Sequence, residues 1–300
     1  MHVEPTTRAE PDHMVAPRDR VRRTFWVGLA AIAVYVLLAA GLGNLVDILV
    51  PSASPELEFA LSHLLPLPIA IGSGLWFARW SGWRRDVWTQ RPVTAEPPRR
   101  RWMLAIPVLL LVGPVLGFFD VPWSERSLGL VLLLAVGCLL VGLGEELFYR
   151  GILRVSLRSH HGELVTLLVT SALFGLSHSL GSMIDGIPAS IIAFQVGATA
   201  FDGALFYAAF RATGRLWVPV LIHALTDFSL YLRSDAWSAA PGHGIPDPAA
   251  ATVAVQFVLG ALLIAVVVSF IREDARARRQ RRAATAEPPL SATGATSDPS

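Results

Sequence analysis

The chain has 300 residues, of which 53% are hydrophobic and 16% charged, and its mean hydropathy is +0.51. This composition excludes an ordinary soluble domain and indicates a polytopic membrane protein. The small positive net charge comes entirely from arginine, because the sequence has no lysine. The single cysteine, Cys138, excludes an intramolecular disulfide and a cysteine-based metal cluster, and we interpret it as a small buried apolar residue.

Apolar segments long enough to cross a membrane recur along the chain. Residues 1–20 are expected to be a disordered tail, and residues 273–300 a basic and then low-complexity tail. Between them, residues 21–272 are expected to form one membrane domain, whose segments approach the ~20 residues that a bilayer requires. The eight segments lie at about Thr24–Leu49, Leu57–Trp80, Trp102–Phe119, Leu128–Leu157, Glu163–Met183, Ala189–Arg211, Leu216–Leu232 and Thr252–Ile271. We therefore predict an all-α fold of about eight transmembrane helices, the third bent by its prolines.

The placement of arginine tests that number of spans. With eight spans and an inside N-terminus, 23 of the 25 arginines fall in cytoplasmic segments, and only Arg126 and Arg233 do not. We therefore predict that both termini are cytoplasmic. The arginine- and alanine-rich composition points to a GC-rich bacterial genome, and we expect the chain to lie in the inner membrane of a bacterium. The basic loop from Ser81 to Arg101 is expected to lie along the inner leaflet, and no nucleic-acid binding is inferred from it.

Two adjacent carboxylates, Glu145 and Glu146, follow the uncharged run from Leu128 to Gly144. A carboxylate at the centre of a span costs on the order of 3 kcal/mol, so such residues are functional candidates. Glu146 and Arg150 are four residues apart with the acid first, which favours an ion pair on one helix. Glu145 points away from that pair, by about 100°. The alternative is that both acids only lock helices together.

Later spans add His178 and the pair His223 and Asp227, which are four residues apart and share a helix face. At ~1.5 Å of rise per residue, these side chains and Glu145 can converge in the cytoplasmic half of the bilayer or near its midplane. This convergence requires the fourth span to continue past Arg150, with Arg150 buried and paired with Glu146.

A carboxylate that meets imidazoles in an apolar setting suits hydrolysis. The carboxylate can take a proton from water, and an imidazole can hold that water, bind a metal or stabilise an oxyanion. Two histidines with Glu or Asp also form a plausible zinc site. A divalent metal and a metal-free glutamate mechanism both stay open, and the candidate ligands are Glu145, His178, His223 and Asp227. Neither a Gly-x-Ser-x-Gly elbow nor a His-Glu-x-x-His motif is present, which counts against a serine hydrolase and a zincin.

Three motifs stand in order on successive predicted spans. They are Glu145-Glu146-x-x-x-Arg150, Phe174-x-x-x-His178 and His223-x-x-x-Asp227. Together they resemble the hallmarks of the CPBP intramembrane protease family, which includes type II CAAX prenyl endopeptidases and bacteriocin-processing or immunity proteins of the Abi type. The resemblance covers about residues 128–232, where it places a catalytic core.

The resemblance implies an eight-span intramembrane endopeptidase in which Glu145 and His178 activate water. His223 and Asp227 would handle the oxyanion or a metal, and Glu146 of the catalytic motif would pair with Arg150. Position 227 is Asp where many relatives have Asn. Because an ionised Asp cannot donate a hydrogen bond to an oxyanion, this departure favours a metal ligand or a residue that orients His223.

The expected substrate is a membrane-associated peptide or protein. Two other functions stay open: a non-catalytic scaffold or bacteriocin-immunity factor with the same fold, and a proton-coupled transporter. The absence of a detectable internal repeat counts against the transporter. Gln195 and Asp202 match no hallmark, and we expect them to line a cavity or to pack helices.

Overall fold

The computed structural model describes residues 19–50, 54–184, 186–234 and 250–286. Within these ranges the chain is helical, and its β-type pairing is limited to an isolated bridge between Thr89 and Arg215. This confirms the predicted all-α fold. The expected tail before residue 19 and the tail after residue 286 lie outside the described residues. The segment from 273 to 286, expected to be tail, continues the last helix.

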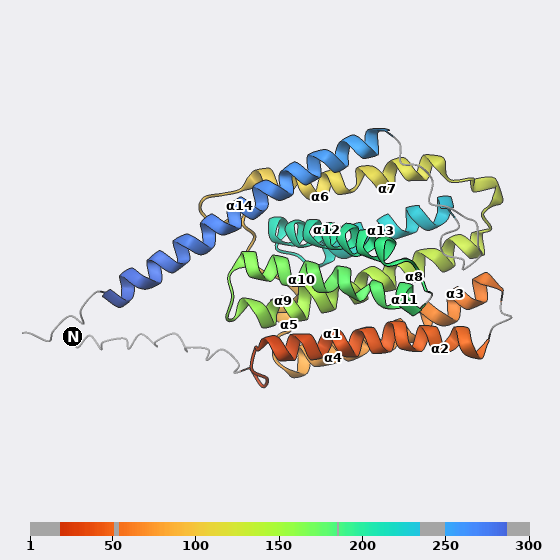
Figure 1. Ribbon diagram of the computed structural model, residues 1–300, viewed down its shortest axis with the longest axis horizontal. Helices are drawn as coiled ribbons and strands as arrows, with labels where there is room; N and C mark the ends of the chain where they lie inside the picture. The colour runs from red at the N-terminus through yellow and green to blue at the C-terminus, as the bar shows by residue number, and fades with distance from the viewer. Residues whose placement is uncertain (1–18, 51–53, 185, 235–249, 287–300) are drawn as a thin grey trace, which may run out of the picture.

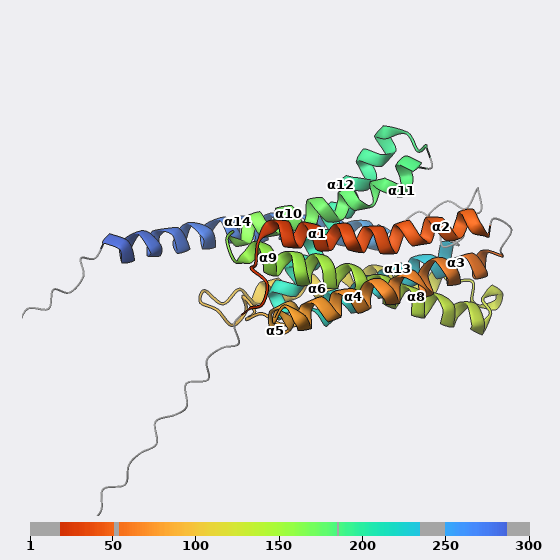
Figure 2. The same cartoon turned by 90° about the horizontal axis from the view of Figure 1, so that it is seen from below.

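The helices group into eight segments that alternate in direction along the chain (Figure 1, Figure 2). The first four are α1 Phe25–Val36 with η1 Leu37–Gly41 and α2 Leu42–Leu49; α3 Pro55–Leu64 with α4 Pro66–Trp80; η2 Arg101–Leu104 with α6 Ala105–Leu110, α7 Val112–Gly117 and η3 Phe118–Asp120; and α8 Leu128–Glu146 with η5 Leu147–Leu153 and α9 Arg154–Arg158. The last four are α10 Glu163–Ser177 with α11 Ser179–Ile184, α12 Ala189–Thr213, α13 Trp217–Ser234 and α14 Ala250–Ala286. Short helices α5 Arg84–Trp88 and η4 Trp123–Glu125 lie in connections.

Within the described ranges, six stretches have the length and hydropathy of membrane spans, and the chain is a multi-pass membrane protein. They are Pro55–Trp80, Arg101–Asp120, Leu128–Arg158, Glu163–Ile184, Ala189–Thr213 and Ala250–Thr285. The first segment contains a shorter apolar helix, Phe25–Gly41, and α13 is not among the six because it carries several polar side chains. The number eight and the cytoplasmic placement of both termini stay predictions.

Prolines interrupt two of the segments. Pro66 begins α4 directly after α3 ends, because proline lacks an N–H and its ring clashes with the preceding turn. In the third segment the helix is interrupted at Leu111, between Pro107 and Pro114. The interruption falls where these two prolines predict a bend.

The segment α8–η5–α9 runs through the middle of the bundle (Figure 1). α8 packs against α13, α3 and α4, while η5 packs against α1, and α10 packs against α12. Around η5 lies an apolar core in which Leu147, Phe148 and Ile152 are almost fully buried. Large apolar side chains such as Phe194 and Phe257 face outwards, as expected of a surface in contact with lipid.

The basic loop between α4 and η2 is attached to the ends of the helices. Trp83, Val87 and Val93 of this loop are fully buried. The Gln90 N–H donates to the carbonyl of Gly214 at 3.0 Å, in the turn between α12 and α13. Apolar burial and backbone hydrogen bonds therefore hold the loop against the bundle, with several of its arginines left at the surface.

Candidate active site

Both candidate acids lie at the end of α8, directly before the π-helical stretch η5. Such widened helical turns occur frequently at functional sites. Arg150 lies within η5 and is fully buried, as is Glu146. Arg150 Nη1 donates to Glu146 Oε1 at 2.8 Å, and its Nη2 donates to the carbonyl of Gly203 on α12 at 2.9 Å. The helix continues past Arg150 to Arg158, so the structure has the buried pair that convergence of the site required.

Two glycines allow the neighbouring helices to approach this point. A Cβ at Gly142 of α8 would lie 2.8 Å from the carbonyl oxygen of Val220 on α13. A Cβ at Gly203 of α12 would lie 2.9 Å from Arg150 Nη2. Real Cβ atoms do not come this close, so both contacts depend on glycine. The first brings α13 and its histidine to the two acids, and the second brings the α12 backbone to Arg150.

His223 of α13 faces three carboxylates. Its Nδ1 lies 3.2 Å from Glu146 Oε1, the oxygen that also accepts from Arg150. Its Nε2 lies 3.7 Å from Glu145 Oε2 and 3.4 Å from Asp227 Oδ2. Because carboxylates only accept, Glu146 orients the ring with Nδ1 as a donor and Nε2 directed to the other two acids.

His178 follows the last residue of α10 and meets Glu145 from the other side. Its Nδ1 lies 2.8 Å from the carbonyl oxygen of Phe174, one turn earlier. A carbonyl can only accept, so Nδ1 carries a proton, and in the neutral ring Nε2 is the acceptor. That Nε2 lies 3.8 Å from Glu145 Oε1. This separation is too long for a direct hydrogen bond and suits one bridging water.

Aromatic rings surround the polar groups and limit their movement. The Arg150 guanidinium lies 4.1 Å from the centroid of the Phe174 ring, a favourable cation–π contact. The same ring makes edge contacts with His178 and His223 at centroid distances of 4.9 and 5.9 Å. Phe206 stacks on His223 at 4.8 Å. The Phe of the Phe-x-x-x-His motif is thus the packing centre shared by the arginine and both histidines.

The acids differ in their access to solvent. The side chain of Glu146 is fully buried, whereas those of Glu145 and Asp227 are 14% and 24% exposed, and that of His178 is 31% exposed. The exposed parts face a cavity of about 960 Å³. This cavity runs between the first segment, α3, α8, α12 and α13. Glu145 is therefore the acid of the adjacent pair that a substrate can reach.

Asp202 and Gln195 also line this cavity. Gln195 Oε1 accepts a hydrogen bond from Ser182 Oγ of α11 at 2.7 Å. Both side chains therefore have the cavity-lining place that the sequence suggested, and Gln195 in addition joins two helices.

The fit of a metal ion can be judged from the donor atoms. Within the described ranges, no group of three or more His, Cys, Asp or Glu side chains is arranged to hold a metal ion. One oxygen of Glu145 faces His178, whereas its other oxygen and Asp227 both face His223. The arrangement does not form a ready metal centre, and the metal set stays a prediction.

Several cavity-lining residues escaped sequence reasoning. Tyr35 of α1 is almost fully buried, stacks on Phe148 at 4.8 Å and lines the cavity. Tyr231 of α13 also lines it. A tyrosine inside an apolar segment is a weak polar signal that could have indicated Tyr35. Phe206 carries no such signal, because a phenylalanine in a span is indistinguishable from lipid-facing residues.

Comparison with known proteins gives a match for the part of the chain that contains the three motifs. Residues 127–229 match the family model described as type II CAAX prenyl endopeptidase Rce1-like. The match covers about a third of the chain and includes all three motifs. It confirms the family resemblance that the motifs indicated. No curated protein and no solved structure matches the chain.

Proposed function

We propose that this membrane protein, with its Rce1-like segment, is an endopeptidase that hydrolyses a peptide bond of a membrane-associated peptide or protein. One observation carries the proposal: the Glu145 carboxylate faces His178 and His223 within a cavity, while the adjacent Glu146 is neutralised by Arg150. One acid is thus available for chemistry and the other is held for structure.

Glu145 and His178 are the pair that activates water in this proposal. The Nε2 of His178 is free to accept because its Nδ1 donates to a carbonyl. A water between Nε2 and the Glu145 carboxylate is oriented by the imidazole and gives its proton to the carboxylate as it attacks the peptide carbonyl. The same carboxylic acid then protonates the leaving amine.

His223 is the oxyanion donor in this proposal. Its Nε2 points to the side of Glu145 opposite His178, and Glu146 and Phe206 hold the ring in place. A preorganised donor aimed at the developing oxyanion stabilises the transition state more than the ground state. Asp227, 3.4 Å from Nε2, orients the imidazole and supports its positive charge.

The proposed substrate reaches the cavity from within the membrane. Three small residues of the first segment, Ala39, Ala40 and Gly43, form one wall, and Thr199 and Asp202 of α12 form another. α11 and the beginning of α12 splay away from the other helices (Figure 2). An extended chain can enter between small side chains and a splayed helix with little rearrangement.

The test uses purified protein in nanodiscs with a set of single-span peptides, and mass spectrometry detects cleavage. We expect Glu145→Gln to lower kcat about 100- to 10,000-fold, because the amide cannot take a proton from water. The matched control is Glu58→Gln, another carboxylate that lines the cavity, for which no ion pair with a histidine is described. Equal cleavage by wild type and Glu145→Gln would contradict the proposal.

Elemental analysis of the active preparation tests the predicted metal set. If Glu145, His178, His223 and Asp227 bind zinc or another divalent ion, it should be present at about one ion per chain and should be lost in His178→Ala. Activity that persists in metal-free protein would support the glutamate mechanism. For the non-catalytic scaffold, rescue of a deletion phenotype by Glu145→Gln protein is the discriminating result.

A further inference from the structure

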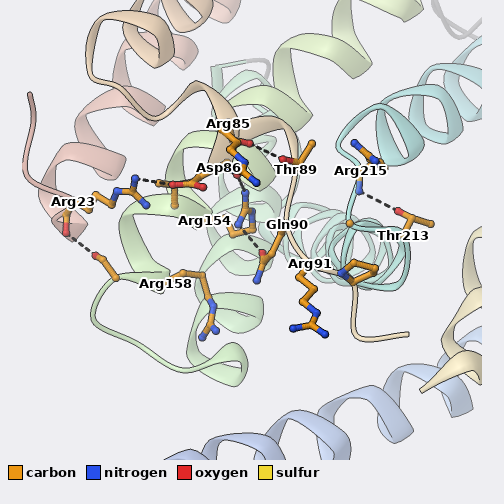
Figure 3. A pocket seen from close by; sticks show the side chains of 14 residues that line it. Arg23, Arg85, Asp86, Thr89, Gln90, Arg91, Arg154, Arg158, Thr213 and Arg215 are labelled. Atoms are coloured by element: carbon orange, nitrogen blue, oxygen red, sulfur yellow. Dashed lines mark hydrogen bonds and ion pairs between the residues drawn. The ribbon is translucent and has the colours of Figure 1, made fainter. Parts of the chain in front are cut away.

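A second cavity, of about 800 Å³, lies at the end of the bundle where α9 ends and α13 begins. Its lining includes none of the candidate active-site residues. A single acid, Asp86, lines it together with six arginines (Figure 3): Arg23, Arg85, Arg91, Arg154, Arg158 and Arg215. We call it the arginine pocket.

Among the described residues, only two of the six arginines have carboxylate partners. Arg23 binds Asp86 at 2.6 Å and Asp19 at 2.7 Å, and Arg158 Nε lies 3.0 Å from Glu163 Oε1. The other four are Arg85, Arg91, Arg154 and Arg215, and none has a carboxylate partner in the described part of the chain. The arginine pocket therefore carries a large uncompensated positive charge.

Among these four arginines, Arg154 gives the strongest indication of a binding site for an anion, because it is only 3% exposed. Its hydrogen bonds go to neutral oxygens: Nε donates to the Arg150 carbonyl at 2.6 Å, Nη1 to Gln90 Oε1 at 2.7 Å, and Nη2 to the Asp86 carbonyl. Its guanidinium also lies 4.4 Å from the Phe210 ring centroid. These contacts hold the group in place, but among the described residues no carboxylate contacts it directly, which is unfavourable for a buried charge.

The walls of the arginine pocket are tied together before any ligand arrives. Trp83 Nε1 donates to the Val21 carbonyl at 3.3 Å, and Ser159 Oγ donates to the Arg23 carbonyl at 2.7 Å. On the opposite side, the Leu216 N–H donates to the carbonyl of Trp88 at 3.1 Å. The N-terminal segment, the basic loop, α9 and the α12–α13 turn thus form one framework. Such preorganisation lowers the entropic cost of binding.

We propose that the arginine pocket binds a phosphate-bearing anion, either a lipid headgroup or a soluble phosphate. Guanidinium groups match phosphate with paired hydrogen bonds, and several of them converge here around one concave site. Phosphate neutralises the charge that Arg154 brings into the framework. The positive-inside rule accounts for the presence of arginines at this end of the bundle. It does not account for the gathering of six arginines around one structured cavity.

The test compares two triple variants of the full-length protein in neutral detergent. The first, Arg85→Gln/Arg91→Gln/Arg215→Gln, removes three exposed arginines of the pocket. The control, Arg278→Gln/Arg279→Gln/Arg282→Gln, removes the same charge from the exposed surface of α14, outside the pocket. Native mass spectrometry counts bound phosphatidylglycerol. Thermal unfolding measures stabilisation by inorganic phosphate against chloride at equal ionic strength.

We expect the pocket variant to bind its phosphate ligand about tenfold or more weakly, from the loss of charge-assisted hydrogen bonds, and the α14 variant to bind like wild type. Selective loss of phosphatidylglycerol identifies a lipid headgroup, and selective loss of phosphate stabilisation identifies a soluble anion. Equal binding by both variants and wild type, or equal loss in both, overturns the proposal. Unchanged unfolding midpoints in phosphate-free neutral detergent show that the variants are folded.

Discussion

Arg150 and Arg154 lie one turn apart on the same helical stretch, and both are buried, yet their surroundings differ. Arg150 has a fully buried carboxylate, Glu146, as its partner. Arg154 has only neutral oxygens and an aromatic ring. The difference follows from position, because the centre of the bundle is closed to ions while the arginine pocket opens at its end. A charge in the closed region needs a partner from the chain, whereas a charge at the opening can take one from solution.

The largest effect is expected from breaking the central pair. Arg150→Met removes the guanidinium that pairs with the buried Glu146 and leaves only His223 beside that carboxylate, so it should lower the free energy of unfolding by about 3–5 kcal/mol. The double variant Glu146→Leu/Arg150→Met removes both charges and should recover most of that loss. Denaturation in mixed micelles measures both values. A double variant as unstable as Arg150→Met would show that the charge is not the cause.

His223→Asn tests the role of the histidine that shares Glu146 with Arg150. This change removes the Nε2 donor that stabilises the oxyanion in the proposed mechanism. It should lower kcat about 100- to 1,000-fold, with KM nearly unchanged. The kcat and KM of peptide cleavage in nanodiscs are the measurement. A loss confined to KM would instead assign His223 to substrate binding.

The approach of α8 to α13 can be disturbed without touching a charge. Gly142→Ala places a methyl group 2.8 Å from the Val220 carbonyl oxygen and should destabilise the fold by about 1–3 kcal/mol. Gly129→Ala, in the exposed first turn of α8, is the control and should be neutral or slightly stabilising. Equal unfolding free energies for the two variants would argue against a tight contact at Gly142.

Arg154→Met tests how much the buried arginine without a carboxylate partner contributes to stability. The substitution removes a buried charge that has no carboxylate partner, so no unpaired acid is left behind. We expect a loss of about 1–2 kcal/mol from the hydrogen bonds, clearly less than for Arg150→Met. The same denaturation experiment in phosphate-free neutral detergent provides the value. Equal losses for the two arginines would remove the distinction between the closed and open regions.

The smallest change is expected from Asp227→Asn. The amide keeps the shape of the side chain but loses the charge beside His223 Nε2, while gaining a donor. We expect a fall in kcat of about tenfold, because the ring keeps its hydrogen bond to Glu146. A complete loss of activity, together with loss of bound metal, would make Asp227 a metal ligand.

Sequence patterns predicted much of the fold because membrane spans are governed by composition. Hydropathy predicted an all-α fold with several membrane spans, and Pro107 with Pro114 indicated the break in the third segment, while the number eight and the arginine-based topology stay predictions. Helix ends were less predictable: α14 continues to Ala286, well past the apolar stretch. The π-helical stretch η5 was not predictable either, since hydropathy and spacing do not distinguish a π-helical turn from an α-helical one.

From the sequence alone, the polar groups that needed an explanation could be identified, because such groups are costly in a membrane and their presence and spacing predict a site. These groups are Glu145, Glu146, Arg150, His178, His223 and Asp227. The different surroundings of these groups could be read only from the three-dimensional structure. It showed that Glu146 is shared between Arg150 and His223, that Glu145 reaches the cavity, and that Phe174 packs against the arginine and both histidines. It also gathered separate arginines from four segments into one pocket. Spacing along a helix fixes only which residues share a face, whereas partners on other helices depend on how closely those helices pack.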